Sequence, residues 1–202
     1  TQSGKNDLSG RVPGTLATVG RGIFYYCGGI YFLFGFTYVV YVTFFVTFLV
    51  QDRGLTEQAA GTLWAWVGLI SLVSGPLFGY FSDRAGRKVA LMLVFSLQAT
   101  SYLLVAAKLP MIAVYLSLGF FGITAWSVPT IMAALVGDYA GPERTAAMFG
   151  LVTFLFGIGQ IGGPACTGLL AEAGGSFSSS FLLTGVLALV AVSMSLFLPQ
   201  KP

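Results

Sequence analysis

The chain contains no histidine, and charged residues make up only 8% of its 202 residues. Histidine is the commonest general base and the commonest metal ligand, so its absence argues against many hydrolases and metalloenzymes. A soluble domain usually carries about 25% charged residues, which indicates that water is not the main solvent of this chain. The formal net charge of +3 is too small and too scattered to indicate a nucleic-acid partner.

Cysteine is equally scarce. Cys27 and Cys166 occur singly in apolar stretches far apart in the sequence, so they form neither a metal site nor a redox pair. Three glycines at 157, 159 and 162 have the spacing of a dinucleotide fingerprint, but they lie inside an apolar run with no preceding strand. The sequence therefore predicts no metal, no cofactor and no enzymatic activity.

Long hydrophobic runs are what the chain does have. A run of about 20 apolar residues is long enough to cross a hydrocarbon core about 30 Å thick. The pattern predicts an all-α integral membrane protein with a polar head (1–22), a six-helix unit (23–198) and a short tail (199–202). Thr56 is expected to cap the second helix and Pro142 to lie in the first turn of the fifth. The six helices are expected at 23–50, 57–81, 88–107, 111–136, 143–171 and 179–198.

Lysine and arginine are distributed unevenly between the two sides of these helices. One side collects eight of them, and the other has only Arg53 and Lys108. Because cytoplasmic loops carry the excess of basic residues, both termini are predicted in the cytoplasm, in a plasma membrane such as the bacterial inner membrane. The eight are Lys5, Arg11, Arg21, Arg84, Arg87, Lys88, Arg144 and Lys201.

The densest cluster of charge lies between the second and third helices, in GYFSDRAGRKVAL from Gly79 to Leu91. Glycine at its start would let a neighbouring helix approach, and Gly86 would permit a tight reversal. Asp83 adds nothing to retention in the cytoplasm, so either it has a partner, such as Arg144 or a helix N-terminus, or the loop is simply solvated.

The spacing G-x-x-x-D-R-x-G-R-K, formed by Gly79, Asp83, Arg84, Gly86, Arg87 and Lys88, resembles the signature loop of the major facilitator superfamily. The resemblance implies a half-transporter built from 3+3 inverted repeats, with a small-molecule substrate and a second six-helix half as partners. That half would lie in the same polypeptide or in a second subunit. The fourth span lacks a basic residue, and GFTYVVYVTFFV and GQIGGPACTG resemble the C-terminal half of the YbfB/YjiJ-like branch.

Four polar or aromatic residues are candidates for a substrate cavity. Tyr38 and Tyr41 belong to an aromatic stripe in the first span, and their hydroxyls need partners at mid-membrane. Trp126 in the fourth span and Gln160 in the fifth are expected at similar depth. Packing within the bundle is the alternative role for each of them. Trp64 and Trp66, nearer the outer interface, are expected to anchor the second helix.

The fifth span also carries small residues at helical spacing. Gly159 and Gly163 are predicted to allow close helix packing, and Pro164 to bend the helix locally. No acidic or basic residue falls near the centre of any span, so if the protein is proton-coupled or binds a charged substrate through a salt bridge, that residue is expected in the other half. The predicted function is transport of a small organic solute by alternating access. The alternative is a membrane receptor or assembly protein of transporter ancestry.

Overall fold

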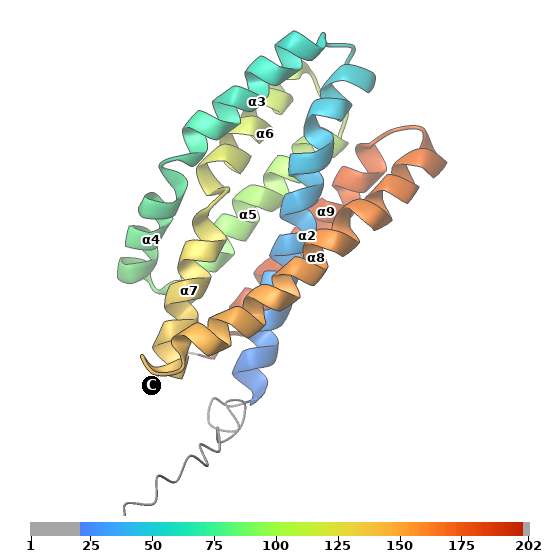
Figure 1. Ribbon diagram of the computed structural model, residues 1–202. Coiled ribbons are helices and arrows are strands. Elements are labelled where there is room, and N and C mark those ends of the chain that lie inside the picture. Colours follow the sequence, from blue (N-terminus) through green and yellow to red (C-terminus); the bar gives the residue numbers. More distant parts are fainter. Residues whose placement is uncertain (1–20, 200–202) are drawn as a thin grey trace, which may run out of the picture.

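The computed structural model describes residues 21–199, and within that range every regular element is an α-helix (Figure 1). Apart from residues 21, 22 and 199, the predicted head and tail lie outside the described residues, so the predicted division into head, six-helix unit and tail stays a prediction. The helices are α2 (Arg21–Gln51), α3 (Glu57–Ser71), α4 (Ser74–Ala85), α5 (Arg87–Ala106), α6 (Met111–Thr124), α7 (Ser127–Ala140), α8 (Thr145–Gly174) and α9 (Ser178–Leu196).

Six of the segments in this range are long and apolar enough to cross a membrane, as predicted. Two of them are interrupted. The second span divides into α3 and α4 at Leu72–Val73, and the fourth divides into α6 and α7 at Ala125–Trp126. Each span was predicted as one helix, although Pro76 and Pro129 are the third residues of α4 and α7, where a proline removes the helical donor to the carbonyl four residues earlier.

The predicted helix starts were right in one case and wrong in another. Thr56 Oγ1 accepts a hydrogen bond from the Ala59 amide at 3.2 Å, which confirms the cap of α3. Pro142 was expected inside the fifth span, but it lies in the turn before α8, which begins at Thr145. Gly141 has a φ of +73° and ends α7 one residue earlier.

The packing of the six spans has an internal two-fold pattern. α2 packs on α8 just as α6 and α7 pack on α3 and α4, and the contact of α5 with α6 corresponds to that of α9 with α2. The third and sixth spans, α5 and α9, pack on each other. This is the pattern expected when the first three spans and the last three are inverted repeats. Figure 1 shows α2, α6 and α7 between the flanking α4 and α8.

The aromatic stripe of α2 contributes large side chains to both parts of the core. Five of its six members are at least 97% buried, and only Tyr38 is half-buried. The stripe therefore serves chiefly as packing. The buried members are Tyr31, Phe34, Tyr41, Phe45 and Phe48.

The two ends of the bundle carry different loops. The junction of α4 with α5 and the turn between α7 and α8 lie at one end, called the loop end below. The α2–α3, α5–α6 and α8–α9 connections lie at the opposite end.

Candidate functional site

The signature loop is one residue long. Gly86 alone separates α4 from α5, and its φ of +91° is one that residues with a side chain rarely adopt. The rest of the motif is helical, because Asp83 and Arg84 belong to the last turn of α4. Arg87 and Lys88 form the start of α5. The expected loop is therefore a sharp corner between two helices, which fixes the direction of its charged side chains.

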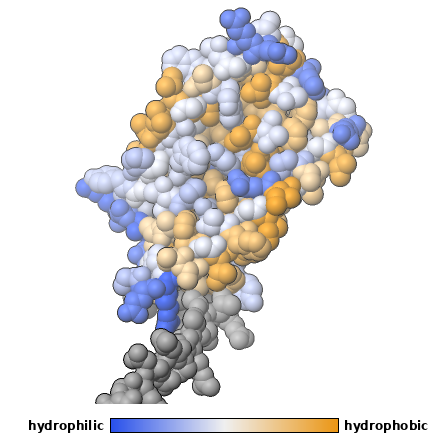
Figure 2. Space-filling view, in the orientation of Figure 1, coloured by the Kyte–Doolittle hydropathy of each residue, from blue (hydrophilic) through white to orange (hydrophobic). Residues whose placement is uncertain are grey.

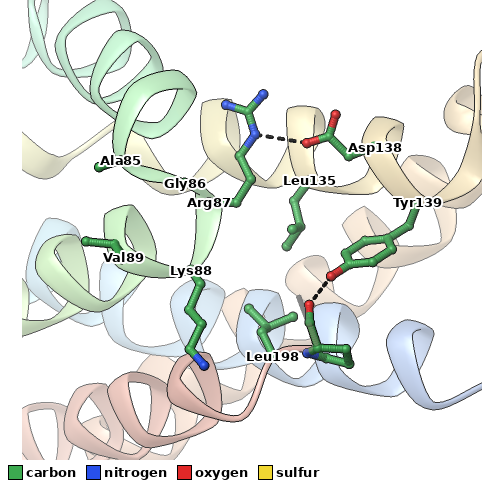
Figure 3. Close-up of a pocket in the computed structure, with 10 residues that line it drawn as sticks. Ala85, Gly86, Arg87, Lys88, Val89, Leu135, Asp138, Tyr139 and Leu198 are labelled. Atoms are coloured by element: carbon green, nitrogen blue, oxygen red, sulfur yellow. Dashed lines mark hydrogen bonds and ion pairs between the residues drawn. The ribbon is translucent and has the colours of Figure 1, made fainter. Parts of the chain in front are cut away.

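Arg87 joins three helices at this corner. Its Nη1 donates to Ser82 Oγ at 2.6 Å and to the carboxylate of Asp83, both on α4. Its Nε donates to Asp138 Oδ2 on α7 at 3.1 Å (Figure 3). The Arg87 side chain is 20% exposed, whereas those of Asp83 and Asp138 are 62% and 44% exposed. A half-buried guanidinium with two carboxylates thus holds α4, α5 and α7 together.

The partner of Asp83 differs from the one proposed from the sequence. Asp83 pairs with Arg87, and Arg144 forms no ion pair with any residue in the described range 21–199. Asp138 was not among the residues predicted from the sequence. The feature that could have identified it is an acidic residue at the end of a span, on the side where the basic residues gather.

Two further contacts fix the end of α4 that carries the motif: α4 packs closely on α7 at Gly79, and Arg84 stacks on Tyr80. A Cβ on Gly79 would lie 3.1 Å from Thr130 Cγ2, so the absence of a side chain lets α4 approach α7. The guanidinium carbon of Arg84 lies 4.4 Å from the centre of the Tyr80 ring. Arg84 therefore stacks on an aromatic face of its own helix and leaves both acids to Arg87.

Beneath the corner is a cavity of about 310 Å³ that opens at the loop end (Figure 3). The Tyr139 hydroxyl donates to the carbonyl of Pro199 across it. The buried side chain of Leu198 belongs to the core next to α5 and α7. The segment after α9 is thus held against the α4–α5 corner. Other residues around the cavity are Gly86, Lys88, Val89 and Leu135.

The two interrupted spans meet at their interruptions. Ser74, the first residue of α4, accepts at Oγ from the Trp126 amide at 3.0 Å. Its carbonyl accepts from Ser127 Oγ at 3.2 Å. Both serines are fully buried. The Trp126 amide released at the α6–α7 break is therefore satisfied across the α4–α7 contact, and a second hydrogen bond joins the two breaks at the same point.

Two candidate cavity residues lie together next to these interruptions. The Tyr38 ring stacks on Phe121 with centroids 5.6 Å apart, and it lies 6.1 Å from the Trp126 ring. Trp126 is 53% exposed. Trp64 was expected to anchor α3 at the interface, but its ring stacks on Phe121 at 6.5 Å. These four rings form one aromatic group, called the aromatic cluster below, on α2, α3, α6 and the α6–α7 break.

Tyr41 occupies a different environment. It is fully buried, and its hydroxyl lies 2.8 Å from Ser117 Oγ, which is itself 2.9 Å from Ser101 Oγ. This chain of hydroxyls ties α2 to α6 and α5. Tyr41 therefore belongs to the core of the half, which corrects its expected place on a cavity wall.

Gln160 lies on α8 beside the contact with α2. Gly159 meets the Phe32 carbonyl, and a Cβ on Gly163 would lie 2.5 Å from the Phe36 carbonyl, so both glycines allow the two backbones to touch. Gln160 itself is half-buried. Pro164 lies inside α8 and has no amide hydrogen, so the Gln160 carbonyl lacks its usual helical donor. The structure does not bring Gln160 into the aromatic cluster.

One face of the bundle is not covered by its own helices. The spans formed by α3 with α4 and by α8, which flank it, are the least buried of the six. Figure 2 shows that pale and hydrophilic residues reach the middle of this face, between hydrophobic areas. A surface that met only lipid would be apolar throughout its depth. The pattern is typical of a bundle face that meets protein or a wet cavity.

Six apolar spans, an internal inverted repeat and the charged corner between the second and third spans define a multi-pass membrane protein with the fold of one transporter half. A family model described as "Major Facilitator Superfamily" matches residues 27–202. The chain belongs to this superfamily.

Curated relatives agree with the family assignment. "Solute carrier family 67 member A1" of Homo sapiens is 29% identical over 170 residues, covering 82% of this chain and 40% of the relative. "Hexuronate transporter" of Bacillus subtilis is 29% identical over 179 residues, covering 80% and 41%. "Quinolone resistance protein NorA" of Staphylococcus aureus is 27% identical over 177 residues, covering 82% and 45%. The chain spans less than half the length of each of these relatives.

Proposed function

We propose that this chain is the C-terminal half of a secondary active transporter that moves a small organic solute across a plasma membrane by alternating access. In this proposal both termini of the half lie in the cytoplasm, and the uncovered face meets a second six-helix half. The stretches quoted from the first and fifth spans support a place in the YbfB/YjiJ-like branch.

The observation that carries the proposal is the aromatic cluster at the paired helix breaks. Trp126 is more than half exposed inside an apolar span, and Tyr38 presents a hydroxyl beside it. Ligand sites are commonly lined by aromatic side chains with a few polar groups. Because Ser74 and Ser127 join the two breaks there, movement of either span would move the wall of this site.

The solute is expected to bind this half by stacking and hydrogen bonding. No acidic or basic side chain lies near the centre of the spans, so a charged group on the solute would be held by the other half. The names of two relatives mention a hexuronate and a quinolone, which are both small organic compounds. They provide the first two probes.

Transport by the intact protein tests the proposal. The protein is reconstituted in liposomes, and saturable flux of a radiolabelled hexuronate or a fluorescent quinolone is measured. Trp126→Ala is expected to weaken apparent affinity about twofold to tenfold, the range for loss of one stacking partner. Tyr41→Phe is the matched control, since it removes a buried hydroxyl outside the site and should lower stability without changing affinity.

The receptor alternative has its own outcome. A receptor would be favoured over a transporter if a solute binds to the protein and Trp126→Ala weakens this binding, but no flux across the bilayer is measured. Residues 1–202 alone should give no flux, because this chain supplies only one wall of the expected cavity. Flux should return when a matching N-terminal half is reconstituted with it.

A further inference from the structure

Arg53 and Lys108 are the two basic residues that depart from the strong bias toward the loop end. Arg53 follows α2 and Lys108 follows α5, so they are 55 residues apart in the chain. Both nevertheless line the same cavity of about 280 Å³ at the opposite end of the bundle. Basic residues are disfavoured in that position if that end is the outer one, and their convergence on a cavity therefore calls for a local cause.

The Arg53 guanidinium packs on an aromatic ring but forms no ion pair within residues 21–199. Its carbon lies 5.3 Å from the centre of the Phe48 ring, so one flat face rests on an aromatic side chain. That contact leaves the in-plane N–H groups available. Nη2 is buried and makes no hydrogen bond to any of residues 21–199. Because Nη2 has no accessible surface, an anion in the cavity would meet the other N–H groups of the guanidinium, and a small shift of the side chain would be needed to give Nη2 an acceptor as well.

Lys108 is held in an uncommon backbone conformation. Its φ is +51°, and it is the only residue other than glycine with a positive φ in the described part of the chain. Glycine or asparagine would adopt this conformation with less strain. Lys108 directly follows Ala107, the C-cap of α5, where chains commonly leave a helix in the left-handed conformation, so this helix end fixes the point from which the lysine side chain extends.

The acidic residue in the cavity is already satisfied by another partner. Asp52 Oδ2 accepts from Ser176 Oγ at 2.7 Å and from the Phe177 amide at 3.1 Å, at the start of α9. It forms no ion pair with Arg53 or Lys108. Glu172 lines the adjoining cavity and not this one. Hydroxyls of Ser176 and Ser178 complete the polar wall.

We propose that Arg53, Lys108 and the α8–α9 turn form a binding site for a phosphate group, either free or on a lipid headgroup. Two cations and the Ser178 hydroxyl match an anion with several acceptor oxygens and more than one charge, whereas the Ser176 hydroxyl is already donated to Asp52. The site is separate from the aromatic cluster and does not depend on the proposed transport function.

The free anion is tested with inorganic phosphate on the intact protein in detergent. Phosphate is titrated at constant ionic strength against chloride, and the midpoint of thermal unfolding is recorded. Saturable stabilisation is expected, because a ligand that binds the folded state raises its stability. Arg53→Gln and Lys108→Gln should each weaken the apparent affinity about tenfold. Arg144→Gln, which removes a charge at the loop end, is the matched control and should respond as wild type.

The lipid source is tested in bilayer discs of phosphatidylcholine with added phosphatidylglycerol. Native mass spectrometry then counts the phosphatidylglycerol molecules that stay bound after extraction. The wild type should retain one more than the Arg53→Gln/Lys108→Gln variant. Arg53→Lys and Lys108→Arg keep both charges and should restore binding, which separates ligand loss from misfolding.

Each result decides the proposal. A phosphate response that the variants lose assigns the site to a free anion, and a loss confined to retained phosphatidylglycerol assigns it to a headgroup. If neither probe distinguishes the variants from the wild type, the proposal is overturned, and Arg53 and Lys108 serve no anion.

Discussion

Arg87 Nε and Asp138 Oδ2 lie 3.1 Å apart and join the start of α5 to the end of α7. The ion pair links the third span to the fourth at the loop end, next to the one-residue corner at Gly86. Any motion that separates α5 from α7 at this end must first break it.

Asp138→Asn tests this link. The variant should express and bind solute normally, with flux slowed up to about fivefold, because a partly exposed ion pair contributes about 0–1 kcal/mol to one access state. Liposome flux and binding are measured on the same preparation. Glu143→Gln removes an exposed acid at the same end that has no ion pair within residues 21–199, and it should behave as wild type. Equal effects of the two variants would contradict the prediction.

Asp83→Asn is expected to have a smaller effect. Its side chain is 62% exposed and pairs with an arginine four residues along the chain, so the charge adds less than that of Asp138. If Asp83 acts through Arg87, the substitution should slow flux in the wild type and add nothing in an Arg87→Gln background. Additive losses would show that Asp83 acts on another group, whereas loss of surface expression would mean a role in folding.

Gly159→Ala and Gly163→Ala should prevent close contact of α8 with α2. Either added Cβ would overlap backbone carbonyls of α2, which cannot move as a flexible side chain can. The expected result is a fall in folded, monodisperse protein on size exclusion. Gly157→Ala on the same helix meets nothing within 4 Å and is the control. A normal yield from the Gly163→Ala variant would argue against a tight α2–α8 contact.

Ser74→Ala and Ser127→Ala should each destabilise the protein, because the first leaves the buried Trp126 amide without its acceptor and the second removes a buried hydrogen bond between α7 and α4. The expected cost is about 1–3 kcal/mol, and the double variant should cost less than the sum of the two. Chemical denaturation of the intact protein measures both. Ser96→Ala removes a hydroxyl that bonds only within its own helix, to the Met92 carbonyl, and should change stability less.

Cysteine labelling tests the orientation. In a Cys166→Ser background, Lys108→Cys should react with an impermeant thiol reagent added outside intact cells, and Ala85→Cys should not. Cys166 is replaced because it is exposed, whereas Cys27 is buried. The reverse labelling pattern would place the loop end outside the cell.

The sequence predicted the six spans because apolar length and the position of charge determine them directly. It also led to the superfamily through the spacing from Gly79 to Lys88. The breaks within the second and fourth spans were missed, although Pro76 and Pro129 lie just beyond them, and their meeting through Ser74 and Ser127 depends on tertiary packing. The ion pair of Asp138 with Arg87 and the buried position of Tyr41 were also not predicted from the sequence. Which hydroxyl meets a cavity and which meets another buried hydroxyl depends on tertiary packing, which periodicity along one helix does not describe.

The inverted repeat relates two pairs of spans that differ in structure: α2 with α8, and α3–α4 with α6–α7. In one pair, α2 and α8 run unbroken for 31 and 30 residues and meet backbone to backbone through glycine. In the other, both spans are jointed at the same depth and share two serine hydrogen bonds. Equivalent positions in the repeat are thus joined in two ways, by backbone contact along one helix pair and by hydrogen bonds between two divided spans in the other. Bending of this half is therefore expected at the second pair, because both of its spans are already divided there.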